Sequence, residues 1–153
     1  MPIIEVARLD AIVQALLSAP PAPFPADPEQ TEAIPNVPGL YGIFLNRDID
    51  VAKDLIRDRC LRAGRGGILR KGNLHGNLRS RIYDQGLMGG GQNAQADLVQ
   101  IVQDRGYAQN RADAQQWIIN NCYVRWISIP FDDRFFTWAE HRLLSVLQPI
   151  WGS

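Results

Sequence analysis

Apolar residues recur along this chain with two different periods. Spacings of three and four predict amphipathic helices over residues 3–18 and from Asp133 to Leu147. Short apolar or alternating runs, bounded by turn residues, predict strands over residues 40–45, 68–71 and 123–129. Three strands that do not alternate regularly with helices indicate an α+β layer fold and not a doubly wound sheet.

Proline separates the first helix from the rest of the chain. Seven of the ten prolines lie in residues 19–38. Because proline removes a backbone donor, this segment is expected to run extended over the surface. We therefore expect an N-terminal helix and arm over residues 1–36, followed by a domain over residues 37–153.

Within that domain, the polar pattern predicts further helices. Residues 50–61 are expected to be helical, and residues 86–121 form an insertion with a glycine-rich loop and two helices, capped by Asn93 and Asn110. The chain is expected to break at three glycines, Gly64, Gly66 and Gly67.

Composition narrows the class of protein. Hydrophobic residues make up 46% of the 153 residues, enough for a core without disulfides or structural metal. No apolar run is long enough to cross a membrane, and the two cysteines, Cys60 and Cys122, lie far apart, so a reduced cytoplasmic protein is expected. The net charge is zero, but residues 47–81 hold ten basic and four acidic residues. That excess is typical of a phosphate-binding surface or of a solvated Arg-rich segment.

Glu140 is the most informative residue of the last predicted helix. It lies three, four and seven residues before Leu143, Leu144 and Leu147, on the apolar stripe. A carboxylate there needs a partner, and a divalent metal is one possibility. On the helix alone the favoured alternative is a capping box, because Thr137 stands three residues before Glu140.

A second candidate region joins a predicted strand to a predicted helix. Asn77 is expected to cap a helix over residues 78–85, whose N-terminus offers free amides and a favourable dipole to an anion. A basic solvated helix face would explain the same pattern. The candidate substrate-binding residues in and before this helix are Arg70, Lys71, His75, Asn77, Arg79, Tyr83 and Gln85.

Four segments resemble, in order, the motifs of the GIY-YIG nuclease family. Pro38–Phe44 resembles the first half of the name motif, with Tyr41 as its tyrosine, and Ile68–Gly72 resembles the second half. Asn77–Ile82 resembles the N-L-x-x-R helix, with Arg81 at the arginine, and Glu140–Trp151 resembles the closing helix with the metal-binding glutamate. The resemblance covers about residues 37–152.

The resemblance implies a small central three-stranded, mainly antiparallel sheet flanked by helices, and metal-dependent hydrolysis of phosphodiester bonds. Glu140 would bind one Mg²⁺ or Mn²⁺, Arg81 would clamp the phosphate, and Tyr41 would orient or deprotonate water. A cation near Tyr41 would favour its phenolate, and Arg70 and Lys71 are the expected source. The implied partner is nucleic acid, with DNA favoured over RNA.

Some positions depart from the family pattern. Arg70 stands at the second tyrosine of the matched motif, and Gly152 stands at the family's final asparagine. An endonuclease is the favoured hypothesis. The alternatives are a catalytically impaired member that binds nucleic acid or a protein, and a helical scaffold with chance motif matches.

Overall fold

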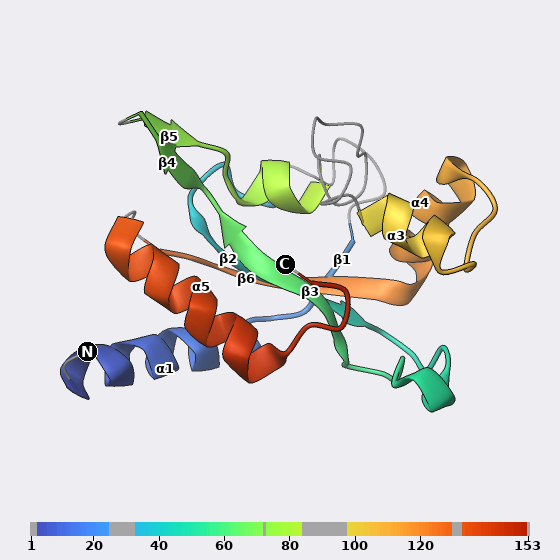
Figure 1. The fold of residues 1–153 in the computed structure, drawn as a ribbon, viewed down its shortest axis with the longest axis horizontal. Coiled ribbons are helices and arrows are strands. Elements are labelled where there is room, and N and C mark those ends of the chain that lie inside the picture. Colours follow the sequence, from blue (N-terminus) through green and yellow to red (C-terminus); the bar gives the residue numbers. More distant parts are fainter. Residues whose placement is uncertain (1–2, 25–32, 72, 84–97, 130–132, 153) are drawn as a thin grey trace.

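A four-stranded antiparallel sheet forms the centre of the molecule. The computed structural model describes residues 3–24, 33–71, 73–83, 98–129 and 133–152. The strands run in the order β1 (Ala22–Pro23), β6 (Cys122–Ser128), β2 (Gly39–Leu45) and β3 (Cys60–Gly66) (Figure 1). A separate two-stranded hairpin consists of β4 (Ile68–Arg70) and β5 (Asn73–His75). The predicted α+β class is confirmed.

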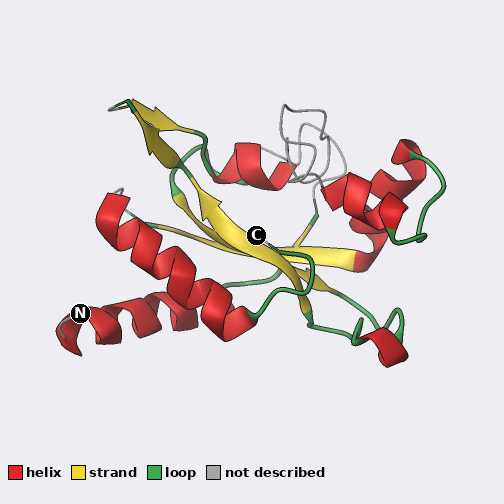
Figure 2. Ribbon diagram, in the orientation of Figure 1, coloured by secondary structure: helices red, strands yellow, loops and turns green. Residues whose placement is uncertain are grey.

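Helices cover both faces of this sheet (Figure 2). One face packs against α1 (Ile3–Ser18) and α5 (Asp133–Leu147), and the other faces α3 (Leu98–Asp104), α4 (Arg111–Asn121) and a helical segment over residues 78–83. Because side chains alternate along a strand, β2 supplies both cores. Leu40 and Phe44 join the α1 and α5 side, whereas Tyr41, Ile43 and Leu45 join the other side.

The helices at both ends of the chain are confirmed, but the number and positions of the strands differ from the prediction. The segment expected as a strand over residues 68–71 pairs only within the hairpin, and the sheet uses β1 and β3. Gly64 and Gly66 do not break the chain, because they pair with Tyr41 and Gly39 inside the β2–β3 ladder. The Pro-rich connector runs extended where β1 pairs with β6.

The expected helix over residues 50–61 is wrong. Only a short 3₁₀ turn, η1 (Val51–Lys53), forms there, and the chain leaves it through Asp54 in the left-handed conformation with φ 61°. No side chain caps this turn, and the Leu55 amide donates back to the Asp50 carbonyl at 3.0 Å. Aspartate favours such local turns over helix interiors, and here the turn leads into β3.

The outer edge of β3 is covered by the end of the chain. The Ile150 and Trp151 amides donate to the carbonyls of Cys60 and Leu61, at 3.2 and 2.8 Å, and the Ala63 amide donates to the Gly152 carbonyl at 3.4 Å. An uncovered edge strand would invite pairing with another chain. These bonds place α5 and the residues after it beside β3.

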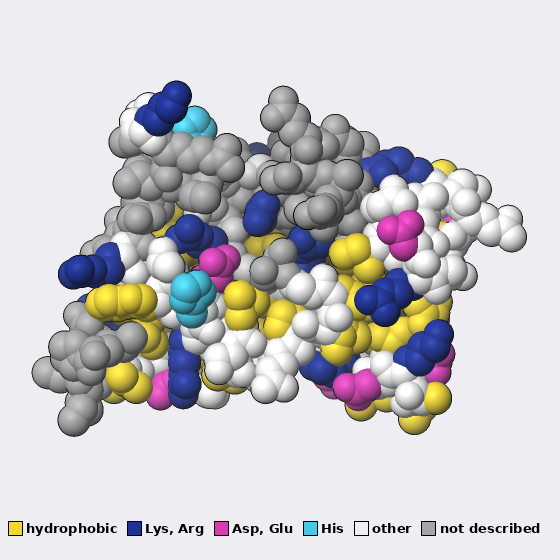
Figure 3. All heavy atoms as spheres, in the orientation of Figure 1, with side chains coloured by type: hydrophobic (Ala, Val, Ile, Leu, Met, Phe, Trp, Pro, Cys, Tyr) yellow, Lys and Arg dark blue, Asp and Glu magenta, His cyan; other side chains and the backbone are white. Residues whose placement is uncertain are grey.

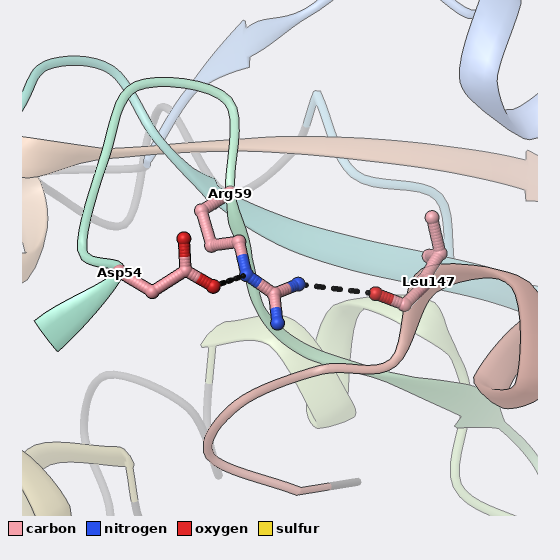
Figure 4. Close-up of polar contacts among 3 residues, drawn as sticks. All are labelled: Asp54, Arg59 and Leu147. Carbon is pink, nitrogen blue, oxygen red and sulfur yellow. Dashed lines mark hydrogen bonds and ion pairs between the residues drawn. The ribbon is translucent and has the colours of Figure 1, made fainter.

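Arg59 anchors the C-terminal end of α5 (Figure 4). Its Nε lies 2.9 Å from an Asp54 carboxylate oxygen, and its Nη1 donates to the Leu147 carbonyl at 3.3 Å. A cation at a helix C-terminus satisfies exposed carbonyls and complements the helix dipole. Arg59 therefore helps to hold α5, which carries Glu140, against the start of β3.

The insertion is only partly within the described residues. The Asn110 side chain accepts a hydrogen bond from the Asp113 amide at 2.8 Å and begins α4, as expected. Asn93 and the glycine-rich loop at residues 86–91 lie outside the described residues. Within the described part of the chain, no helix combines the length and the apolar character needed to cross a membrane.

Candidate active site at the edge of the sheet

Tyr41 and Glu140 meet above Gly64. Gly64 is the cross-strand partner of Tyr41, so Gly64 and Tyr41 face the same side of the sheet. A Cβ atom placed on Gly64 would lie 3.4 Å from the Tyr41 hydroxyl oxygen and 3.6 Å from Glu140 Oε2. The absence of a side chain at Gly64 thus leaves room beside β3 for the phenol of Tyr41, which is 2% exposed, and the carboxylate of Glu140. We call this space the Gly64 notch.

Glu140 reaches this notch around the outer edge of β3. Its Oε2 accepts a hydrogen bond from the Arg65 backbone amide at 3.1 Å, and its Oε1 lies 3.7 Å from Arg65 Nε. The Arg65 guanidinium also donates to the Thr137 hydroxyl at 3.0 Å. The side chains of Arg65 and Glu140 are only 16% and 19% exposed, so the pair is partly shielded from water.

The capping-box interpretation of Glu140 is wrong. Helix α5 begins at Asp133, which places Thr137 inside the helix and not at its N-cap. The Glu140 carboxylate bonds instead to β3. It accepts a hydrogen bond from the Arg65 amide of β3, and this structural role accounts for a carboxylate on the apolar stripe.

Two residues of this site were missed in the sequence, Arg62 and Arg65. Both lie in β3, in the segment that the glycines were expected to interrupt. Arg62 pairs with Ile43 and is 4% exposed, on the same face as Gly64 two residues later. A buried arginine is rare and is held by interactions within the protein, as Arg62 is. The signal in the sequence was the pair of arginines, Arg62 and Arg65, among small residues over 62–66.

Arg62 also changes the expected source of positive charge near Tyr41. Arg70 and Lys71 belong to the hairpin outside the sheet, where Arg70 pairs with Asn73. Arg62 is the diagonal neighbour of Tyr41 across the β2–β3 ladder, a position typically about 7–8 Å away. A buried guanidinium on the Tyr41 face is the better-placed cation.

The helical segment carrying Arg81 packs on the same face as Tyr41. Asn77 begins it, as expected: its side chain accepts from the Ser80 amide at 2.9 Å, and the Ser80 hydroxyl accepts from the Asn77 amide at 3.0 Å. Residues 80–83 have the wider π-helical geometry, which often occurs at functional sites. Arg81 is half-buried in this turn and takes part in interactions within the protein.

Glycine allows this helix to approach the sheet closely. A Cβ on Gly66 would lie 2.5 Å from the Leu78 amide nitrogen, and a Cβ on Gly39 would lie 2.6 Å from the Leu78 side chain. Gly39 and Gly66 are cross-strand partners, so they form one flat platform under Leu78. The platform fixes the start of the Arg81 helix at the end of β3.

The remaining predicted substrate-binding residues are dispersed. The Arg79 Nε donates to the Ile34 carbonyl at 2.8 Å and ties the helix to the connector, while Tyr83 packs against the core. Lys71 and His75 are exposed on the hairpin. Gln85 lies outside the described residues. The structure thus brings Tyr41 and Glu140 together and places the Arg81 helix on the same face.

The described part of the protein offers one carboxylate ligand at the notch, that of Glu140. A single carboxylate suits a hard divalent cation only when the cation keeps much of its hydration shell. Among the residues that the structure describes, no three His, Cys, Asp or Glu side chains gather as a metal-binding group. Mg²⁺ is commonly held by one or two carboxylates together with water and substrate phosphate. Glu140 supplies one carboxylate, and Oε1 makes no closer contact to Arg65 than 3.7 Å.

Other reactive groups lie away from the notch. Burial raises the pKa of the Cys60 thiol to about 12, so this residue is protonated and inert as a nucleophile at neutral pH. A separate cleft of about 330 Å³ is lined by residues that include Pro21, Arg57 and Tyr123. Burial, and then the hydrogen bond to Asp58, raise the pKa of Tyr123.

Comparison with known proteins assigns no family or function to this chain. Neither a scan against protein-family models nor searches of curated proteins and of solved structures found a match to the chain.

Proposed function

We propose that this chain is a metal-dependent endonuclease of the GIY-YIG type that hydrolyses phosphodiester bonds in DNA. The observation that supports this most is the shared position of the Tyr41 hydroxyl and the Glu140 carboxylate above Gly64. These are two of the three residues to which the family resemblance assigns the chemistry. They are 99 positions apart in the sequence and come together only through the fold.

The pairing of β2 with β3 also changes where we place the second half of the name motif. Because Gly64 faces Tyr41 directly, we assign that half to Arg62-Ala63-Gly64 in preference to the segment at residues 68–72. Arg62 then occupies the place of the second tyrosine. A buried arginine there supplies positive charge where the family has a second phenol.

In this proposal each side chain acts on a bound phosphodiester. Tyr41 orients the attacking water, and Arg62 places positive charge on the same face of the sheet. Arg81 contacts the phosphate and offsets its developing charge. Glu140 would hold one Mg²⁺ or Mn²⁺, which when bound stabilises charge on the phosphate and the leaving oxygen. Arg65 fixes the orientation of Glu140.

The runner-up function is a catalytically impaired domain of the same type that binds nucleic acid. The ion pair between Arg65 and Glu140 supports it, because a guanidinium beside the carboxylate competes with a divalent cation. Both proposals keep nucleic acid as the partner, with DNA preferred. The reduced cytoplasm remains the proposed location, since both cysteines are buried and free.

The test is cleavage of supercoiled plasmid and labelled duplex DNA with Mg²⁺ or Mn²⁺. Glu140→Gln keeps an oxygen that can accept from the Arg65 amide but removes the charge, so the fold should survive while cleavage falls about 10²-fold or more. Asp54→Asn is the matched control, because it removes another carboxylate paired with an arginine. Equal cleavage by wild type and Glu140→Gln would refute the proposal, as would a wild-type chain that cuts no substrate.

A further inference from the structure

The β4–β5 hairpin is a surface ribbon that the sheet does not use. Its pairs are Ile68 with His75, Leu69 with Leu74, and Arg70 with Asn73, and none of them joins the four-stranded sheet. Isolated two-stranded ribbons are marginally stable in water. A ribbon of this kind gains order and stability when it packs against a partner.

The charge of the hairpin indicates the chemistry of that partner. The hairpin, residues 68–75, carries Arg70 and Lys71 and no Asp or Glu. Lys71, Asn73 and His75 are exposed on the hairpin. In Figure 3, a basic side chain and a histidine stand together where Figure 1 draws the hairpin. A hairpin with basic residues and no acidic ones is complementary to a polyphosphate backbone.

The position of the hairpin relates it to the Gly64 notch. It begins two residues after Gly66, the last residue of β3, and ends two residues before Asn77 caps the Arg81 helix. Gly67 and Gly76, with φ of 124° and 78°, turn the chain at its base, where a Cβ on Gly76 would lie 3.9 Å from the Gly67 amide nitrogen. The ribbon therefore projects from the end of β3 that borders the notch (Figure 1).

The dimensions of the ribbon fit a groove of duplex DNA. Strands of three residues extend about 10 Å beyond their base. The B-DNA major groove is about 12 Å wide and 8.5 Å deep and admits a two-stranded ribbon, whereas the major groove of duplex RNA is too narrow.

We propose that the β4–β5 hairpin binds duplex DNA by entering the major groove, with Lys71 contacting phosphate. The choice of nucleic acid as ligand rests on the proposed function, but the hairpin's role does not require cleavage. The hairpin, and not the Glu140 helix, is then the element that distinguishes duplex DNA from duplex RNA.

Lys71→Gly tests this with little risk to the fold. Lys71 has φ of 50°, a conformation that glycine adopts more readily than lysine, so the turn is retained while the charge is lost. Lys53→Gly is the control, because Lys53 is an exposed lysine in η1, at the opposite end of the β2–β3 pair. Binding of a labelled DNA duplex is measured by fluorescence anisotropy in EDTA over a series of salt concentrations.

Lys71→Gly should weaken duplex DNA binding about three- to tenfold and lower the salt slope of log K by about 0.9, the value for one phosphate contact. Lys53→Gly should change neither, and Lys71→Arg should retain wild-type binding. Duplex RNA binding should not respond to Lys71→Gly.

The outcomes separate this inference from the proposed function. A wild type that cuts DNA, with Lys71→Gly and Lys53→Gly binding equally, overturns the hairpin proposal and leaves the nuclease standing. A loss of DNA binding in Lys71→Gly, with a wild type that never cuts, supports the hairpin and refutes the nuclease. An equal loss on duplex RNA overturns the assignment to the DNA major groove.

Discussion

Gly64→Ala should separate folding from function at the notch. The added methyl group would occupy the point that the Tyr41 hydroxyl and Glu140 Oε2 both border. It changes neither of those side chains, and it removes no hydrogen bond. If a water, a metal ion or a phosphate oxygen must occupy that space, the alanine excludes it.

The structure allows the size of both effects to be worked out. The contacts of the new Cβ, at 3.4–3.6 Å, are ordinary van der Waals distances, and Gly64 lies in an extended strand without positive φ. Alanine in a strand interior is about 0.5–1 kcal/mol more favourable than glycine, so the free energy of unfolding should hold or rise. Cleavage should fall about 10²-fold, the scale for displacing a reacting group by about 1 Å.

Gly66→Ala is the contrasting variant two residues along the same strand. Its Cβ would lie 2.5–2.7 Å from backbone atoms of Asn77 and Leu78, so overpacking should cost about 1–3 kcal/mol or more. Urea unfolding and plasmid cleavage are measured for both variants. Wild-type cleavage by Gly64→Ala would refute the notch as the reaction site, and unfolding of Gly64→Ala would refute the steric reasoning.

Two further predictions concern stability. Arg59→Ala should lower the free energy of unfolding by about 1 kcal/mol in urea titrations, because it removes the hydrogen bond to the Leu147 carbonyl at the end of α5. Asp54→Asn should lower it by only about 0.5 kcal/mol, because it removes an exposed ion pair. Equal losses would contradict the capping role of Arg59. The thiol of Cys60 has its ordinary pKa of 9.0 in the unfolded chain and a pKa of about 12 in the folded protein. Its contribution to the free energy of unfolding is therefore fully present below pH 9 and is lost as the pH rises from 9 to 12. The loss should be about 1.4 kcal/mol per pH unit up to pH 12, and Cys60→Ala should reduce the slope of urea-derived stability against pH; an unchanged slope would contradict this.

The helices and β2 were predictable because their signals are local. The periods of α1 and α5 and the apolar run of β2 can be read from neighbouring residues. β3 was not predictable in this way. Its sequence, from Cys60 to Gly66, places two arginines among small residues without a strand period. It becomes a strand because β2 and residues 150–152 pair on its two sides.

The candidate site was half predictable for the same reason. Tyr41 and Glu140 were named from motif order, and the fold brings them together. Arg62 and Arg65 were missed because their meaning depends on which strand lies next to β2 and on which helix crosses its edge. Such tertiary neighbours leave no period in the sequence.

Glu140 therefore has a structural role whether or not it binds a metal. The amide of Arg65 and its guanidinium hold the carboxylate in one orientation, which is the preorganisation a catalytic ligand needs. Loss of activity on removing Glu140 would by itself not separate the two roles, because the same change releases the β3 edge. Glu140→Gln preserves the edge acceptor, and Gly64→Ala leaves the carboxylate intact while filling the space before it. If both variants remain folded and both lose cleavage, the function of Glu140 lies in that space and not in its bond to β3.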